Sequence, residues 1–330
     1  MIIGSLWFAF QFVQPAPPKS FVLATGTKFG GYYTFGQKYA ELLAKKGVTV
    51  EIRPSQGSVD NIKLLTDPNS GVQAALVQGG ISSSDKYPEL VSVGRLFAEP
   101  LWIFHRLDQP IDRLTQLVGK RIAVGTEGSG TFALATSLLS ENRIDARNAV
   151  LLKIGGAQAV QSLQSGEADA GMFALAPNAP AFKQLINNPQ LKLMSLSQAD
   201  AYARRYPHLT HVVYPAGTAD IVGNRPPTDV HLLAPVAALV VRRDLHPTIV
   251  NLLARAAKSI HASPGMFQKR DEFPWNFDPE YELAAEAENF YLNGTRFWQR
   301  YLPFWLATFI ERMILMIVPI LTIVLPVFKL

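Results

Sequence analysis

Two loops in this chain contain the residue types that bind small anions at the start of a helix. In each, glycine, serine or threonine follows a short apolar run that predicts a buried strand, and apolar residues at helical spacing come next. The loops span residues 25–33 and 125–131. Because backbone N–H groups and the positive end of a helix dipole meet at such a point, both loops are candidate anion sites. A tight turn without a ligand is the alternative for the first loop.

These loops do not fit the common nucleotide or nucleophile motifs. The first lacks the Lys-Ser/Thr pair of a phosphate-binding loop and the G-x-G-x-x-G spacing of a dinucleotide site. Tyr32 and Tyr33 at its mouth fit a small organic ligand better, since each offers an apolar face and a hydroxyl. In the second loop Glu127 stands where a G-x-S-x-G elbow needs glycine. We therefore interpret Ser129 as part of a ligand cradle.

Metal and hydrolytic chemistry are not indicated elsewhere. His208 and His211 are three residues apart in a Pro-rich segment with no acidic residue nearby, whereas a zinc site needs three or four ligands. No histidine is obviously paired with a serine or aspartate in a hydrolytic triad. We expect no metal, no cofactor and no catalytic residue.

The elements that position the loops alternate between strands and helices. Apolar runs predict strands at 48–52, 73–77, 91–97 and 101–105, and a helix that starts at Ser58, a natural N-cap. Gln78 follows the strand at 73–77 directly. Ligands bind at the carboxyl edge of parallel strands, so these strand ends and helix starts are expected to form one site.

The second part of the chain continues this pattern. Strands are predicted at 150–153 and 169–174, with a helix at 157–165 between them. Phe173 and Pro177 stand where the second strand leaves the sheet, and either line a pocket or simply pack. A strand at 191–194 precedes a polar, Pro- and Gly-rich region that reaches residue 229. The final predicted elements are a strand at 233–241, a helix from residue 247 to about 263, and a helix at about 279–292.

Composition fits an ordinary globular protein with room for two domains. The chain has 330 residues, of which 48% are hydrophobic and 17% charged. The net charge of +5 is spread without a basic cluster, so nucleic-acid binding is not expected. The absence of cysteine excludes disulfides and thiolate metal sites, and is compatible with an oxidising periplasm.

Both ends of the sequence are strongly apolar. Residues 1–13 followed by a Pro-rich stretch resemble the tail of a signal peptide or anchor with a stiff linker. Residues 302–328 are apolar except for Glu311 and Arg312, and aromatic residues precede the uninterrupted part. We interpret this second segment as a transmembrane anchor, with a buried terminal helix as the alternative.

Several segments together resemble one protein family, the TAXI-type solute-binding proteins of TRAP transporters. They are the Gly30-Gly31-Tyr32-Tyr33 loop, the helix start Gly57-Ser58-Val59-Asp60-Asn61, and residues 118–131, 159–174 and 234–245, in the family's order. The resemblance covers residues 21–292, and residues 300–321 resemble the tail of a membrane-anchored subgroup. The family's usual Gln-Ser-Asp at one strand end is here Gln78-Gly79-Gly80, without the carboxylate.

The resemblance implies an α/β, two-lobed periplasmic type II solute-binding fold with a C-terminal transmembrane helix. Residues 1–20 are then a signal or anchor remnant with its linker, and residues 299–330 the membrane-anchoring segment. Residues 21–100 with 235–298 form lobe I, and residues 101–234 form lobe II. Combined with the loop positions, it predicts this ligand-binding set: Thr25, Gly26, Gly31, Tyr32, Tyr33, Gly57, Ser58, Val59, Gln78, Ser129, Gly130, Thr131, Phe173 and Pro177.

The function implied is capture of a small organic acid and its delivery to TRAP membrane subunits, without catalysis. The binding domain faces the periplasm or the extracellular side of the bacterial inner membrane, whose lipid bilayer holds the anchor. The ligand is a dicarboxylate or a glutamate-like acid. Because Gly80 removes a possible partner for a ligand amine, a dicarboxylate without an amino group is preferred. A membrane-anchored ligand sensor with the same fold is the alternative.

Overall fold

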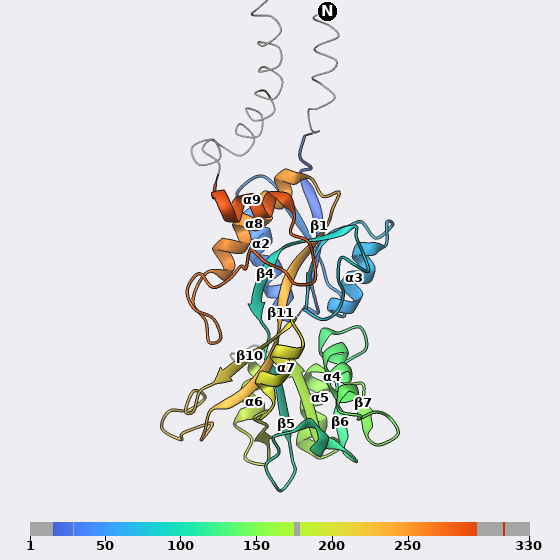
Figure 1. The fold of residues 1–330 in the computed structure, drawn as a ribbon, viewed down its shortest axis with the longest axis vertical. Coiled ribbons are helices and arrows are strands. Elements are labelled where there is room, and N and C mark those ends of the chain that lie inside the picture. The colour runs from blue at the N-terminus through green and yellow to red at the C-terminus, as the bar shows by residue number, and fades with distance from the viewer. Residues whose placement is uncertain (1–15, 29, 175–178, 296–312, 314–330) are drawn as a thin grey trace, which may run out of the picture.

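The computed structural model describes residues 16–28, 30–174, 179–295 and 313. These residues form two α/β halves, one above the other in Figure 1, with the described N-terminal strand and the last described helix both in the upper half. The predicted anchors at 1–13 and 302–328 lie outside the described residues, apart from Met313. Among the described residues, no helix is long and apolar enough to cross a membrane.

The upper half is built on a sheet of mixed direction. Strand β1 pairs in parallel with β2 and β3, and β11 (Val230–Arg242) runs antiparallel to both β3 and β4. The strands of this half are β1 (Ser20–Ala24), β2 (Thr49–Arg53), β3 (Val72–Val77) and β4 (Leu90–Ala98). The helices are α2 (Gly31–Ala44), α3 (Ser58–Thr66), α8 (Pro247–His261) and α9 (Ala285–Asn293).

The lower half contains a second group of paired strands. β6 lies parallel to β7 and β8, and β5 lies antiparallel to β8 and β9. The strands are β5 (Leu101–His105), β6 (Arg121–Ala123), β7 (Val150–Leu152), β8 (Ala170–Ala174), β9 (Lys192–Leu193) and β10 (Leu209–Tyr214). The helices are η1 (Leu114–Leu117), α4 (Gly130–Glu141), α5 (Gly156–Ser165), α6 (Pro180–Ile186) and α7 (Ala199–Arg205).

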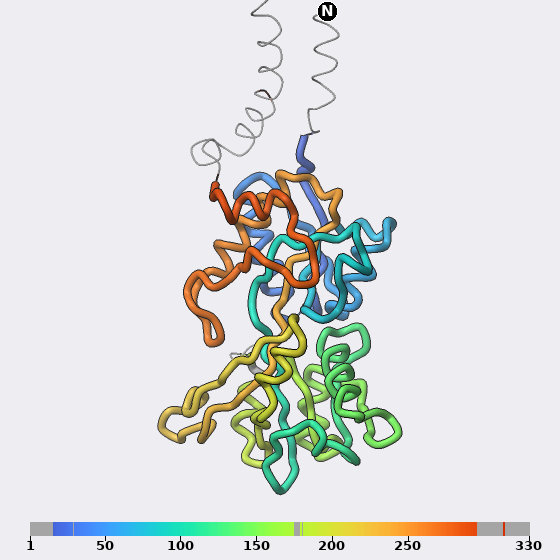
Figure 2. Tube along the Cα trace, viewed as in Figure 1, coloured from blue at the N-terminus to red at the C-terminus, as the bar shows by residue number. Residues whose placement is uncertain are grey.

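The chain passes between the halves along two adjacent routes. β4 continues into β5 through Glu99 and Pro100, and β11 (Val230–Arg242) is long enough to serve both halves. Residues 230–235 of β11 pair with β10, and residues 236–242 pair with β4. The backbone N–H of Glu99 donates to the carbonyl of Pro235 at 2.9 Å, so the two crossings are bonded to each other. Figure 2 shows both routes at the narrow middle of the molecule.

Alternation along the strands places a helix layer on each face of the upper sheet. Leu239 packs with Leu43 of α2 and Leu253 of α8, whereas the next residue, Val240, packs with Leu65 of α3. Successive strand residues point to opposite faces, so one apolar run supplies two cores. Each of these buried aliphatic side chains contributes about 1.5–3 kcal/mol relative to exposure.

The structure corrects three sequence predictions about local elements. Ser58 is not the N-cap of α3: Gly57 occupies that position, with φ of +131°, and the helix begins at Ser58. The polar region before residue 229 contains α7 and β10, for which no element was predicted. The last helix begins only at Ala285, because the preceding residues run alongside β4 and the Ala284 N–H donates to the Ser92 carbonyl at 2.8 Å.

Candidate functional site

The starts of α3 and α4 lie against each other where the two halves meet. A Cβ on Gly57 would lie 3.2 Å from Cα of Ser129, so glycine is needed for this approach as well as for its positive φ. The Asp60 N–H donates to the carbonyl of Gly128 at 3.4 Å. Figure 1 shows α3 directly above α4. The predicted helix start at Ser58 and the predicted loop at 125–131, one in each half, are therefore brought together.

Gln78 at the end of β3 links these two helix starts. Its backbone N–H donates to Oγ of Ser58 at 2.9 Å, and its side-chain Nε2 donates to the carbonyl of Gly130 at 3.0 Å. Both Gln78 and Ser58 are buried. A buried polar side chain must have its hydrogen bonds satisfied, and Gln78 achieves this across the junction. Gln78 therefore joins the α3 start to the α4 start, in addition to the hydrogen bond between Asp60 and Gly128.

Ser129, interpreted from sequence as part of a ligand cradle, is the N-cap of α4 in the structure. Its Oγ accepts a hydrogen bond from the Phe132 N–H at 3.1 Å and donates to the carbonyl of Thr126 at 2.6 Å. The hydroxyl is thus occupied by backbone groups of its own loop. This arrangement orients the first turn of α4 and supplies no base for a nucleophilic serine.

Thr25 and Gly26 are buried and support the site from behind. The Thr25 carbonyl accepts from Oγ of Ser55 at 2.8 Å and from Nδ2 of Asn61 at 2.6 Å. Its methyl group lies against Gly36 of α2, where a Cβ would approach within 2.7 Å. Thr25 therefore fixes α2 and α3 relative to β1.

Tyr32 reaches from α2 to the crossing between the halves. Its hydroxyl donates to Oε2 of Glu99 at 2.5 Å, and its ring packs edge-on against Phe97 with centroids 6.1 Å apart. Burial, and then the Glu99 carboxylate, raise the pKa of Tyr32 well above its usual value, while Ser58 acts in the opposite direction. Tyr32, Ser58 and Glu99 thus share one polar environment beside the α3 start.

Glu99 is a member of this site that the sequence analysis missed. Its side chain is half-buried, and burial raises its pKa to about 7 against the lowering effect of the Tyr32 hydrogen bond. In the described part of the chain no arginine, lysine or histidine forms an ion pair with it. One sequence signal could have identified Glu99: it is an acidic residue placed directly after an apolar strand and before Pro100.

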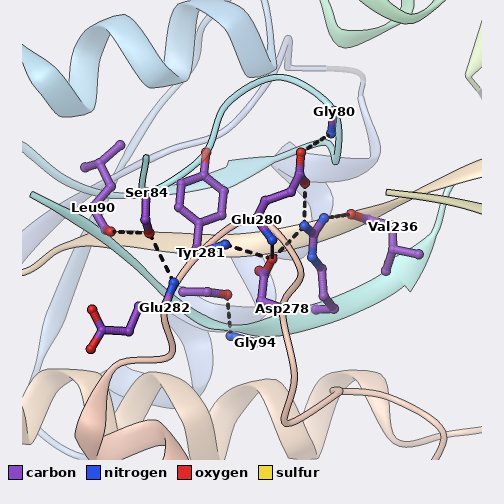
Figure 3. Close-up of polar contacts among 11 residues, drawn as sticks. Gly80, Ser84, Leu90, Gly94, Val236, Asp278, Glu280, Tyr281 and Glu282 are labelled. Atoms are coloured by element: carbon purple, nitrogen blue, oxygen red, sulfur yellow. Dashed lines mark hydrogen bonds and ion pairs between the residues drawn. The ribbon is translucent and has the colours of Figure 1, made fainter. Parts of the chain in front are cut away.

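The strand-end position Gly79-Gly80 is closed by a separate ionic cluster. Arg95 is buried and pairs with Asp278 at 2.6 Å and with Glu280, while its Nη1 donates to the Val236 carbonyl at 2.6 Å. The Gly80 N–H donates to Oε1 of Glu280 at 2.7 Å. Figure 3 shows both carboxylates directed at the same guanidinium. Both Nη atoms of Arg95 are engaged within this cluster, and its charge is balanced there by the two carboxylates.

Gly80 has no room for the aspartate that the resembled family usually carries nearby. Its φ is +86°, and a Cβ there would lie 2.6 Å from Cδ2 of His208. Burial, and then Arg95, lower the pKa of His208, so this imidazole is held in its neutral form. The ring of His208 therefore occupies the space beside Gly80 at the end of β3.

Residues 23–260 match the NMT1-like family. This protein is a member of the NMT1-like family. Its α/β fold, with two strand groups joined by β4–β5 and by β11, is of the periplasmic solute-binding-protein type.

Solved structures similar to this NMT1-like protein are distant in sequence. A protein of Bordetella bronchiseptica RB50 is 16% identical, with 74% of this chain and 72% of that chain covered and a TM-score of 0.50. The periplasmic aliphatic sulphonate binding protein SsuA of Escherichia coli is 13% identical, covers 74% and 73%, and has a TM-score of 0.48. An ancestral arginine-binding protein bound to arginine is 15% identical, covers 74% and 92%, and has a TM-score of 0.46. These likenesses concern the fold alone.

The remaining predicted residues of this NMT1-like protein are distributed differently. Gly31 is exposed, and Tyr33, Val59 and Thr131 are half-buried close to the three helix starts. Phe173 is buried in the lower-half core, where its ring lies edge-on to Phe104 at 6.3 Å and over Gly171, so it has the packing role left open from sequence. Pro177 lies outside the described residues.

A separate hollow of about 510 Å³ is lined mostly by lower-half residues, together with Met266 from the segment after α8. It is bordered by Phe182, Ile186, Tyr214, Ala219 and Met266 among others, and none of the predicted ligand-binding residues that the structure describes is among its lining residues. Within the described ranges, no group of three or more His, Asp or Glu side chains is arranged to hold a metal ion.

Proposed function

We propose that this NMT1-like protein captures a small organic acid between its two halves and delivers it to the membrane subunits of a TRAP-type secondary transporter. The observation that carries the proposal is the meeting of the α3 and α4 starts, bridged by Gln78. In this proposal residues 21–100 with 235–298 and residues 101–234 are two lobes that close by a hinge at Glu99–Pro100 and Pro235.

The physical basis for anion capture is the field at the helix starts. Each helix N-terminus favours an anion by about 0.3–1 kcal/mol when exposed, and by up to about 2 kcal/mol when partly buried. Two converging termini therefore select an acid without a dedicated arginine. Arg95 is paired with Asp278 and Glu280 within the protein. This pairing supports binding of the acid by the helix starts and not by Arg95.

The transport role is supported by the resemblance of the motifs at residues 30–33 and 57–61 to TAXI-type proteins. In this role the chain performs no chemistry: the membrane subunits consume an ion gradient, and this protein determines which solute reaches them. The predicted anchor at 299–330 keeps the binding domain on the extracytoplasmic face of the inner membrane.

A thermal-unfolding screen with the full chain in detergent tests ligand capture. Organic acids and amino acids are supplied singly, and a ligand at about 100 times its Kd stabilises the folded state by roughly 2.7 kcal/mol. A concentration-dependent rise in Tm with an acid supports the proposal, and no rise with any acid contradicts it.

Reconstituted uptake tests the transport role separately. The ligand identified by the screen is offered to proteoliposomes that contain TRAP membrane subunits, with an imposed ion gradient. Uptake that requires this chain supports the proposed role. Ligand binding without any contribution to uptake supports the ligand sensor instead.

A further inference from the structure

Glu99 occupies an unusual electrostatic position for an acidic residue. It lies on the crossing between the halves, where its backbone is fixed to Pro235 and its Oε2 accepts the hydroxyl of Tyr32 at 2.5 Å. Its other oxygen, Oε1, has no hydrogen-bond donor in the described part of the chain. A half-buried carboxylate whose described hydrogen-bond donor is one neutral hydroxyl is poorly compensated for the hydration it loses.

The charged groups around Glu99 do not supply its missing partner. From α2 it faces the neutral Tyr32, and Ser58 of α3 lies beside that hydroxyl. From β4 the nearest guanidinium is Arg95, which acts on Tyr32 but is shared by Asp278 and Glu280, so that this trio carries net negative charge. The site therefore has hydrogen-bond donors at its helix starts and one uncompensated acceptor at Glu99.

We propose that Glu99 and Tyr32 form a subsite for a positively charged nitrogen of the ligand, an ammonium or a guanidinium. This inference rests on the proposed function, because the acidic group of the same ligand is held at the α3 and α4 starts. Tyr32 donates its proton to Glu99, and its oxygen keeps a lone pair that accepts a second N–H. The ligand is then an amino acid or a similar zwitterion.

The subsite reverses the ligand preference drawn from the sequence. Gly80 does remove a carboxylate from the end of β3, but Glu99 places another at the end of β4, on the opposite side of β11 from β3. A charge-assisted hydrogen bond to nitrogen is about twice as strong as a neutral one. An acid with an amino group should thus bind more tightly than its deaminated analogue.

Calorimetric titration with matched acids tests the subsite. The pairs are glutamate with glutarate and aspartate with succinate, titrated at pH 8 into the full chain in detergent. The variants are Glu99→Gln, Tyr32→Phe and, as a matched control with the same charge change, Glu41→Gln, which alters an exposed ion pair with Lys45 on α2. Thermal unfolding of each variant verifies that it is folded, and Tyr32→Phe probes the subsite with Glu99 intact.

We expect the wild-type chain to bind at least one amino acid ten-fold or more tightly than its deaminated partner. Glu99→Gln should remove most of that ratio while leaving the affinity for the deaminated acid within about three-fold, and Tyr32→Phe should reduce the ratio partially. Glu41→Gln should change neither affinity. Lowering the pH from 8 to 6 should weaken binding of the amino acid to the wild-type chain and not to Glu99→Gln, since a protonated Glu99 loses its charge.

Two results would overturn the subsite while leaving acid capture intact. One is equal or tighter binding of the deaminated acids to the wild-type chain. The other is a Glu99→Gln variant that weakens both members of a pair equally, which is what a purely structural role would produce. Absence of binding by all four acids, together with no rise in Tm with any acid of the screen, would contradict the proposed function itself, and the subsite with it.

Discussion

The side-chain amide of Gln78 donates a hydrogen bond to the carbonyl oxygen of Gly130 at 3.0 Å, joining the end of β3 to the start of α4. The contact is close: a Cβ on Gly130 would lie 2.6 Å from Oε1 of Gln78. The two halves therefore meet through a small residue and a buried amide. This junction is where we place the acidic group of the ligand.

Replacing Gly130 with alanine should disturb both folding and ligand binding. The added methyl group forces Gln78 to move, and overpacking of this kind costs about 1–3 kcal/mol of unfolding free energy. Gly31→Ala is the matched control for stability, since a Cβ there meets nothing within 4 Å and alanine favours the first turn of α2. Urea unfolding measures both variants, and equal stabilities would show that the junction tolerates a methyl group.

Removing the charge of Arg95 should be strongly destabilising. Arg95→Met leaves the buried Asp278 and the half-buried Glu280 without a cation, and breaking a buried ion pair costs about 3–5 kcal/mol. The control is Arg243→Met, which breaks an exposed pair with Glu282 and should cost about 1 kcal/mol or less. If chemical denaturation gives similar losses for the two variants, the Arg95 cluster does not stabilise the closure of the β3 end.

Glu99 should make the protein less stable as the pH rises. Its pKa is raised from 4.5 to about 7 by burial, so the folded state holds the proton more tightly than the unfolded state. This contribution is fully present below pH 4.5 and is lost as the pH rises through 7. The full shift corresponds to roughly 3 kcal/mol at 1.36 kcal/mol per unit, and partial solvent access reduces it to about 1–2 kcal/mol.

The measurement for this effect is the unfolding free energy of wild type and Glu99→Gln at pH 4.5 and pH 8. The unfolding free energy of Glu99→Gln minus that of wild type should be about 1–2 kcal/mol larger at pH 8 than at pH 4.5. Comparison with the variant cancels the contributions of His105, His208, His211 and His261, whose pKa values are lowered chiefly by burial and which therefore act in the opposite direction. A difference that is the same at both pH values would mean that Glu99 titrates as an ordinary exposed carboxylate.

The described helices and strands were largely predictable because burial leaves a simple pattern. The run from Leu233 to Val241 is apolar on both faces, since its residues alternate between two helix layers, and it predicts a strand correctly. β10 was not predictable in this way. It lies between Pro- and Gly-rich stretches, and its regularity comes from pairing with residues 230–235 of β11, a contact that local sequence does not encode.

The late start of α9 has a comparable long-range cause. Residues before Ala285 have helical spacing, but the Asp278 carboxylate accepts hydrogen bonds from the N–H groups of Glu280 and Tyr281, at 3.0 and 3.2 Å. The same carboxylate pairs with Arg95 of β4. An ionic contact across most of the chain thus overrides a local preference for helix.

Local sequence motifs predict some residues of the candidate site but not others. Glycine and serine at strand ends and helix starts indicate where backbone N–H groups gather, and Ser58 and Ser129 lie near each other in the structure. Glu99 belongs to no sequence motif, because its role in the site depends on the Tyr32 hydroxyl, which reaches it from α2. A single polar residue beside a crossing between halves becomes informative only once the fold is known.

Membrane attachment gives a further prediction that does not depend on the ligand. If residues 302–328 anchor the chain, full-length protein should sediment with membranes and require detergent for extraction. A chain lacking residues 1–13 and everything after Arg300 should be soluble and retain ligand binding. Full-length protein that is freely soluble without detergent would show that this C-terminal segment is a buried helix.

The most direct test of the central claim is calorimetric titration of wild-type chain and Gly130→Ala with the acid that raises Tm most in the screen. We predict saturable binding of one acid per chain, weakened ten-fold or more by Gly130→Ala, because the methyl group displaces Gln78 at the junction of the α3 and α4 starts. Unchanged affinity in a folded Gly130→Ala variant would contradict the placement of the ligand between the two halves.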